Sequence, residues 1–181
     1  MRPSRILLGI VAVLNLNCGR LPAQKGDPGM PESPWELRLS VSEGLNLRAT
    51  LHNRTKVPQT YLRPSKIQPL ELILTAPSGE RVAGFDTRAK AKFDNTVYRE
   101  MYRQAAPGSD VTLTEASLDP DHTLRWGPFL FANLPAGTYH AQAVWRSETN
   151  QYYDPKSKRT GVVKDVWIGT VTSNTVEFSV Q

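Results

Sequence analysis

The sequence predicts an all-β domain, folded as a two-sheet antiparallel sandwich that follows an N-terminal signal segment and a flexible tether. Three observations support this prediction. Several short segments alternate apolar and polar residues with the period of two that a half-buried strand requires. Turn signals rich in Gly, Pro, Asn and Asp separate these segments. After the N-terminus, no stretch has the length and period of a long helix.

The stretch 131–146 gives the clearest strand. A Leu-Pro-Ala-Gly turn leads into residues 137–146, where Tyr139, Ala141, Ala143 and Trp145 fall on one face. Large aromatic side chains fill the interiors of sandwiches. We therefore expect Tyr139 and Trp145 in the core.

Other segments show the same alternation. Residues 36–41 and 45–53 flank a Ser-Glu-Gly turn, which predicts a hairpin. Residues 70–76 and 81–85 flank Pro-Ser-Gly-Glu and predict a second hairpin. The segments 111–114 and 174–180 are further strands, which brings the expected total to eight or so.

Two stretches interrupt the rhythm of strands. In the insertion 86–110, the spacing of Tyr98, Met101 and Tyr102 predicts one or two helical turns. The segment 147–168 is polar and predicts a long connection. Long loops in a compact sandwich are where function usually lies.

The N-terminus predicts export. A short positive region, Met1 to Arg5, precedes an apolar run over 6–14. This run is too short to span a bilayer, which needs about 20 residues, and matches a secretory signal. Cys18 then resembles the lipidated cysteine of bacterial lipoproteins, although Asn15-Leu16-Asn17 departs from their pattern. Lipidation of Cys18 and plain cleavage near Ala23 both stay open.

The predicted organisation has three parts. Residues 1–18 are a signal peptide or lipoprotein signal, residues 19–34 are a tether rich in Pro and Gly, and residues 35–181 are the domain. The net charge of +5 is concentrated at the N-terminus: residues 1–23 hold three arginines and no acid, which leaves 19 basic against 17 acidic groups. So small an excess gives no reason to expect a nucleic-acid partner.

The residues 134–139, Leu-Pro-Ala-Gly-Thr-Tyr, resemble the corner of immunoglobulin-like and fibronectin type III-like domains. The resemblance implies an immunoglobulin-like sandwich in which Leu134, Gly137 and Tyr139 form a structural corner and the tyrosine bonds back to the backbone. Residues 167–178 resemble the final strand of many exported bacterial domains of this type. Residues 51–55 with Pro58, then 72–79, are similar to the intracellular proteinase-inhibitor family of bacterial sandwiches.

The sequence contains none of the common catalytic motifs. The histidines His52, His122 and His140 lack zinc-ligand spacing, and there is no Gly-x-Ser-x-Gly elbow and no Gly-rich loop before a helix. The turn 119–122 could bind a cation, but a solvated Asp-Pro turn explains it better. We therefore predict a protein without catalytic residues, cofactor or metal. Residues 53–55, Asn-Arg-Thr, match a glycosylation acceptor.

The residues with binding character lie in or beside the 147–168 connection. Tyr152, Tyr153 and Trp167 could form a stacking surface for a sugar or peptide, or could pin their own loop; the basic residues beside them are Lys156, Lys158 and Arg159. The sequence thus predicts a non-catalytic domain of the cell envelope, lipid-anchored or secreted. Its partner would be a protein or polysaccharide, bound through 86–110 and 147–168, and a membrane would be involved only through a lipid on Cys18.

Two other hypotheses stay open. One is a proteinase inhibitor that acts through a rigid exposed loop. The other is a hydrolase with an unfamiliar site, which would need His122 or His140 close to acidic residues in a pocket.

Overall fold

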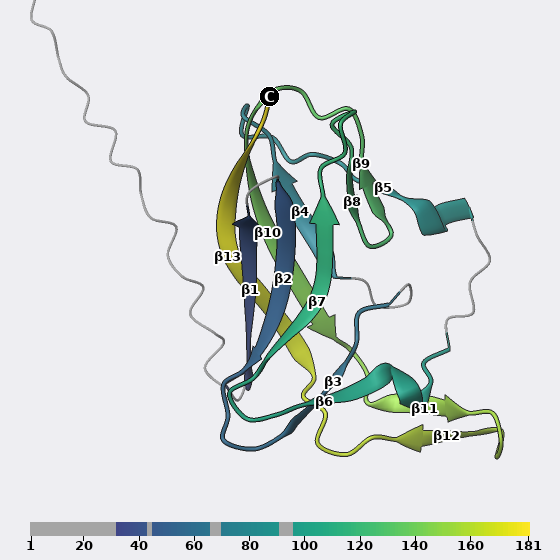
Figure 1. Ribbon diagram of the computed structural model, residues 1–181. Helices are drawn as coiled ribbons and strands as arrows, with labels where there is room; N and C mark the ends of the chain where they lie inside the picture. The colour runs from purple at the N-terminus through teal and green to yellow at the C-terminus, as the bar shows by residue number, and fades with distance from the viewer. Residues whose placement is uncertain (1–31, 43–44, 66–69, 91–95) are drawn as a thin grey trace, which may run out of the picture. The chain divides into compact units, whose positions relative to one another are not determined.

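The computed structural model describes residues 32–42, 45–65, 70–90 and 96–181, and these form an all-β fold of several antiparallel sheets (Figure 1). The predicted signal segment, Cys18 and most of the tether lie outside the described residues. In chain order the elements are β1 (Trp35–Ser42), β2 (Asn46–Asn53), β3 (Gln59–Leu62), β4 (Glu71–Thr75), β5 (Phe85–Asp86), η1 (Thr87–Lys90), η2 (Arg99–Met101), β6 (Tyr102–Ala105), β7 (Asp110–Ser117), β8 (Leu124–Trp126), β9 (Phe129–Phe131), β10 (Gly137–Ser147), β11 (Gln151–Asp154), β12 (Arg159–Val162) and β13 (Gly169–Val180).

The first sheet has the order β1-β2-β7 and confirms the first predicted hairpin. Its register places Leu37 opposite Leu51 and Leu39 opposite Ala49, and all four side chains are buried. The intervening polar residues face solvent, which is the alternation that the sequence shows. β7 pairs with the other edge of β2 and is longer than the predicted 111–114.

The second sheet has the order β13-β10-β4, with the predicted strand β10 at its centre. Tyr139, Ala141, Ala143 and Trp145 are buried as expected. The register with β13 shifts between Gln142 and Val144, where the Ala143 N–H donates to Ser173 Oγ at 2.9 Å. This bulge buries Val144 as well.

The buried faces of these two sheets belong to one hydrophobic core. Trp35 of β1 and Trp145 of β10 meet edge to face with their ring centroids 6.1 Å apart, and Tyr61 lies 5.8 Å from Trp35. Such aromatic contacts add to the apolar area that they bury. At the edge, Asn174 of β13 bonds both backbone groups of Leu39: its Nδ2 donates to the carbonyl and its Oδ1 accepts the N–H, each at 2.9 Å.

Three smaller sheets correct the sequence prediction. The second predicted hairpin is wrong in extent, because only Thr75 and Arg81 form a bridge and β5 pairs with β9 instead. The segment 147–168 contains the hairpin β11–β12, and β3 pairs with β6. The turns predicted near Met101 are a single short 3₁₀ helix, η2. The strands of these sheets have only two to four residues each, too few for an alternating pattern to mark them in the sequence.

Candidate binding surface

The residues of the predicted corner make contacts inside the fold. The Tyr139 hydroxyl donates to the Pro135 carbonyl at 2.8 Å, and its ring stacks on Phe178 with centroids 5.6 Å apart. Burial raises the pKa of the tyrosine. Leu134 is buried beneath the turn, and Gly137 (φ +146°) sits where a Cβ would come within 2.5 Å of Pro77. These residues therefore have a structural role, since the phenol is used inside the fold.

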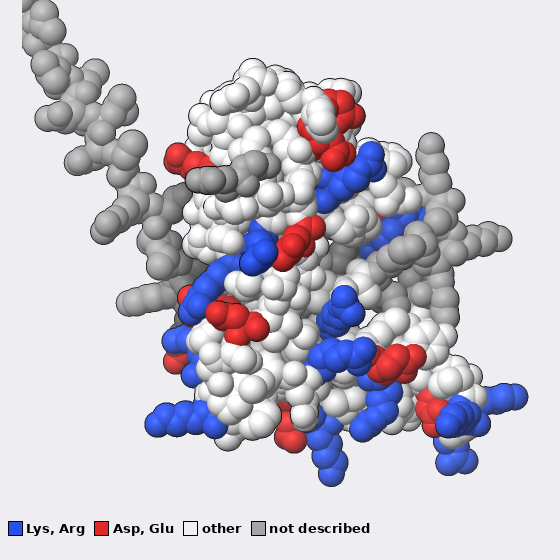
Figure 2. Space-filling model, in the orientation of Figure 1, with Lys and Arg blue, Asp and Glu red and all other residues white. Residues whose placement is uncertain are grey.

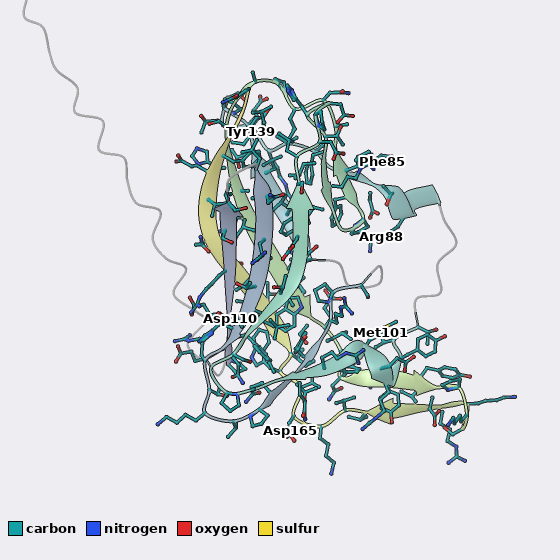
Figure 3. The ribbon with its side chains drawn as sticks, in the orientation of Figure 1. Phe85, Arg88, Met101, Asp110, Tyr139 and Asp165 are labelled. Carbon is teal, nitrogen blue, oxygen red and sulfur yellow. The ribbon has the colours of Figure 1, made fainter. Side chains whose placement is uncertain are left out.

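The other predicted site residues lie at the opposite end of β10, around the hairpin β11–β12. We call β11, β12 and their turn the arm; it projects beside η2 in Figure 1. In Figure 3, the label of Tyr139 lies at the end of the domain away from the arm, and the label of Met101 in η2 lies next to the arm. The corner lies where β10 begins and the arm follows its end. Because β10 has 11 residues at about 3.3 Å each, the length of the strand separates the two regions.

Tyrosines fasten the arm to its neighbours. The Tyr102 hydroxyl donates to the Thr149 and Gln151 carbonyls at 3.1 and 3.0 Å. Burial raises the pKa of Tyr102, and the bond to Thr149 opposes that shift. The Tyr153 N–H donates to the Val97 carbonyl at 2.8 Å, which aligns β11 with the segment before η2. The arm is therefore held by hydrogen bonds at its base.

Tyr152 and Tyr153 point to opposite faces of the arm. The Tyr152 ring lies against Gly161, where a Cβ would come within 2.4 Å of it, and the Arg99 guanidinium sits 5.4 Å from the ring centroid. Tyr153 is 38% exposed and lies edge-on to Tyr98 at 6.5 Å. Tyr152 is thus partly used within the arm, whereas Tyr153 offers its ring to solvent.

The three predicted cations surround the tip of the arm. Lys156, Lys158 and Arg159 are exposed. Asp154 organises the turn, because its carboxylate accepts the Lys156 N–H at 3.0 Å and the Ser157 hydroxyl at 2.7 Å. The bond from the Ser157 hydroxyl, and then that from the Lys156 N–H, lower the pKa of Asp154. The turn closes with Lys158 in the left-handed region, at φ +55°.

Trp167 does not join this exposed group. Its ring stacks on Trp145 at 6.0 Å and 24°, at the edge of the core. Gly169 permits this packing, since a Cβ there would come within 2.3 Å of the ring. A change at Trp167 would therefore disturb the core as well as any surface contact.

The histidines lie on separate elements with separate partners. His52 Nδ1 is 2.8 Å from Asp110 Oδ1, and His140 Nδ1 is 3.5 Å from Glu177 Oε1. His122 occupies a turn at φ +60° and its N–H donates to the Asp119 carbonyl. Within the described ranges, no group of three or more His, Cys, Asp or Glu residues could hold a metal ion. Among the helices of the described residues, none is long and apolar enough to cross a bilayer.

The glycosylation pattern falls on a buried asparagine. Asn53 is 0% exposed, and its Nδ2 donates to the Val57, Ala105 and Ala106 carbonyls at 2.9–3.2 Å. Its Oδ1 accepts the N–H and hydroxyl of Thr55 at 3.0 and 2.8 Å. The side chain therefore closes the turn from β2 towards β3 and is out of reach of a modifying enzyme.

A pocket of about 320 Å³ was not predicted from sequence. Its apolar walls are Leu70, Leu113, Trp126 and two prolines, and Arg88 adds a charged group. Asp86 bonds Arg88 at 2.6 Å; this bond lowers the pKa of the carboxyl and raises that of the guanidinium. Arg88 and Phe85 are labelled at this side of the domain in Figure 3. Four separate segments build the pocket, so no local motif indicates it.

Known proteins do not assign this chain to a family. No family model matches the chain, and no curated protein has a matching sequence. The residues of the candidate surface are therefore the evidence for its function. The arm brings together Tyr152, Tyr153 and the three tip cations, whereas Trp167 packs against the edge of the core and the corner residues stabilise the fold.

Proposed function

We propose that this protein is a non-catalytic domain of the cell envelope, exported and either lipid-anchored at Cys18 or secreted. The domain binds a protein or polysaccharide partner through the connection 147–168, which contains the arm, and the insertion 86–110. In this proposal the domain is an immunoglobulin-like sandwich, for which the shared core of the β1-β2-β7 and β13-β10-β4 sheets is one support. The bond from Tyr139 to Pro135 is another, because it matches the tyrosine corner of that fold.

The observation that carries the binding proposal is the arm itself. It is braced by Tyr102 and by the backbone of Tyr153, yet its tip and one face stay in solvent. A braced, projecting hairpin loses little conformational freedom on binding, which favours affinity. Tyr153 and Arg159 are of residue types that are enriched at protein interfaces, and Lys156 and Lys158 add hydrogen-bond donors beside them.

The test is retention of an envelope partner by arm variants. We would immobilise the wild-type protein, a triple variant Tyr153→Ala/Lys156→Ala/Lys158→Ala, and a matched variant Arg48→Ala/Arg81→Ala/Arg125→Ala on the sheets, and apply envelope extract. Wild type and the matched variant should retain the same partner, and the arm variant should lose it at least tenfold. Equal retention by all three would overturn the arm as the binding surface. Trp167 is left unchanged because its replacement would perturb the core.

Mass spectrometry of the mature N-terminus tests the other half of the proposal. A diacylglyceryl mass on Cys18 would support the lipid anchor, and a chain that begins near Gln24 would support secretion. A chain that still begins at Met1 would contradict export.

A second candidate, a proteinase inhibitor, is favoured by one observation: the tip is exposed and held rigid by Asp154. Lys156 or Lys158 would then occupy the acidic specificity pocket of a trypsin-like protease. Inhibition by the wild-type protein that is lost in Lys158→Ala would support this function. A panel of secreted proteases that shows no inhibition at micromolar protein would exclude it.

A further inference from the structure

We propose that the end of the domain that carries the arm docks directly on a membrane surface rich in anionic lipid headgroups. We call this region the arm end and define it as residues 54–63, 99–105 and 147–168. The inference goes beyond the proposed function, because it concerns lipid rather than a protein or polysaccharide. It rests on charge, on exposed apolar side chains and on where the first strand of the domain begins.

Charge is unevenly divided in the fold. The arm end contains nine Lys or Arg residues and four Asp or Glu residues, an excess of five, whereas residues 24–181 together carry 19 basic and 17 acidic groups. Figure 2 shows this on the visible face, where blue side chains gather towards the arm. Elsewhere the arginine side chains that the structure describes have acidic partners, as in the pairs Arg48–Glu115 and Arg125–Asp119.

Five cations of the arm end are available to a ligand. In the described part of the chain, the residues that are exposed and form no ion pair include Lys56, Lys156, Lys158, Arg159 and Lys164. Each basic residue close to an anionic leaflet strengthens binding about fivefold. Five such groups would give strong, salt-sensitive attraction.

Apolar side chains at the same end distinguish a membrane from a soluble polyanion. Val57 and Val162 are each 56% exposed, Ile168 is 47% exposed and Tyr153 is 38% exposed. Val162 shares one face of the arm with Tyr153, as the β11–β12 register requires. The parallel bridge from Thr60 to Val166 brings the segment before Ile168 beside β3, which follows Val57. A bilayer interface accepts aliphatic and tyrosine side chains, whereas a charged polymer in water does not.

The first strand, β1, begins at this same end. The Arg54 N–H donates to the Pro34 carbonyl at 2.9 Å, and the Trp35 ring packs on Tyr61. Sixteen residues, 19–34, separate Cys18 from β1. Fully extended they would reach about 50 Å. A chain anchored at Cys18 would therefore enter the domain at the end that carries the cations.

The experiment measures which end of the full chain meets lipid. In a Cys18→Ser background we would attach a fluorophore to Thr160→Cys on the arm or to Ala136→Cys at the corner; both positions are exposed. Quenching by headgroup-attached quencher is measured on vesicles of phosphatidylcholine alone and with about 30% phosphatidylglycerol. We expect quenching at position 160 on the anionic vesicles only, with no quenching at position 136.

Two variants test the physical basis. Lys56→Gln/Lys156→Gln/Lys164→Gln should weaken the quenching response on the order of 100-fold in lipid concentration. The matched variant Arg48→Gln/Arg81→Gln/Arg125→Gln loses the same charge from the sheets and should leave the response unchanged. Raising the ionic strength from about 0.1 M to about 1 M should abolish the quenching at position 160, because the Debye screening length falls to about 3 Å.

Other results would overturn the inference. Equal quenching at both positions, quenching independent of lipid charge, or no quenching at position 160 would each exclude docking through the arm end. Salt-sensitive binding to dextran sulfate without quenching on vesicles would assign the cations to a soluble polyanion instead. Because the vesicles contain no protein or polysaccharide, failure here leaves the proposed partner function untouched.

Discussion

Replacing Asn53 tests how the turn that leads to the arm end is held. The side chain is fully buried and its amide bonds three carbonyls, of which the one of Ala105 is itself buried. Asn53→Ala would remove these three bonds and the acceptor of the Thr55 N–H, although the Val57 carbonyl keeps the Thr55 hydroxyl and the Ala106 carbonyl keeps Ser109 as donors. A buried acceptor left unpaired costs about 1–3 kcal/mol and each part-buried bond about 1 kcal/mol. We therefore expect Asn53→Ala to lower the free energy of unfolding by about 3 kcal/mol.

Asn53→Asp separates hydrogen bonding from shape. The new carboxylate has nearly the same size but would face three carbonyl oxygens in a buried site, at a cost of about 4 kcal/mol at neutral pH. Burial and these oxygens raise the pKa of the new carboxyl in the folded state above its unfolded value. The folded protein then binds more protons, so the variant should recover stability relative to wild type as the pH falls towards 4.

The assay is urea unfolding, followed through the fluorescence of the buried tryptophans, at several pH values. Asn46→Asp is the matched control, because Asn46 is exposed at the start of β2, and its unfolding free energy should change by less than about 0.5 kcal/mol. A loss below 1 kcal/mol in Asn53→Ala, or a pH-independent loss in Asn53→Asp, would refute the role assigned to this amide.

Three further predictions concern other contacts. Tyr139→Phe removes the bond to Pro135 and should lower the unfolding free energy by about 1 kcal/mol, whereas Tyr153→Phe at the exposed arm should change it little; equal effects in chemical denaturation would contradict the corner. Gly169→Ala should displace the Trp167 ring and reduce the near-ultraviolet circular dichroism of its stack with Trp145, at a cost of about 1–3 kcal/mol; an unchanged spectrum would show that the ring is not confined. The bond to Arg146, supported by the bond to Arg81, lowers the pKa of Glu71 in the folded state; Glu71 therefore stabilises the fold above its unfolded pKa, and this contribution is lost as the pH falls through the folded value. In Glu71→Gln the decrease in stability towards acid pH should be shallower by at most about 1 kcal/mol, and an identical pH profile would exclude the pair.

The sequence was most informative where a strand has one face in the core. The alternation in 36–53 and 137–146 predicted β1, β2 and β10, because burial of one face imposes a period of two. The arm has no such period: Gln151 and Val162 pair in solvent, and contacts from Tyr102 and Arg99, which are distant in sequence, help to hold it. The same limit applies to the site residues. Tyr153 and Trp167 look alike in sequence, and only the three-dimensional contact with Trp145 makes one of them part of the core.

The side-chain amide of Asn174 has a consequence for association between copies of the protein. A strand at the margin of a sheet offers unpaired backbone groups to any passing extended chain, which is a route to oligomers and fibres. At Leu39 those groups are already occupied from within the same molecule. One amide thus blocks the middle of β1 as a template, and the domain is protected from self-assembly there without a charged residue or a proline at Leu39.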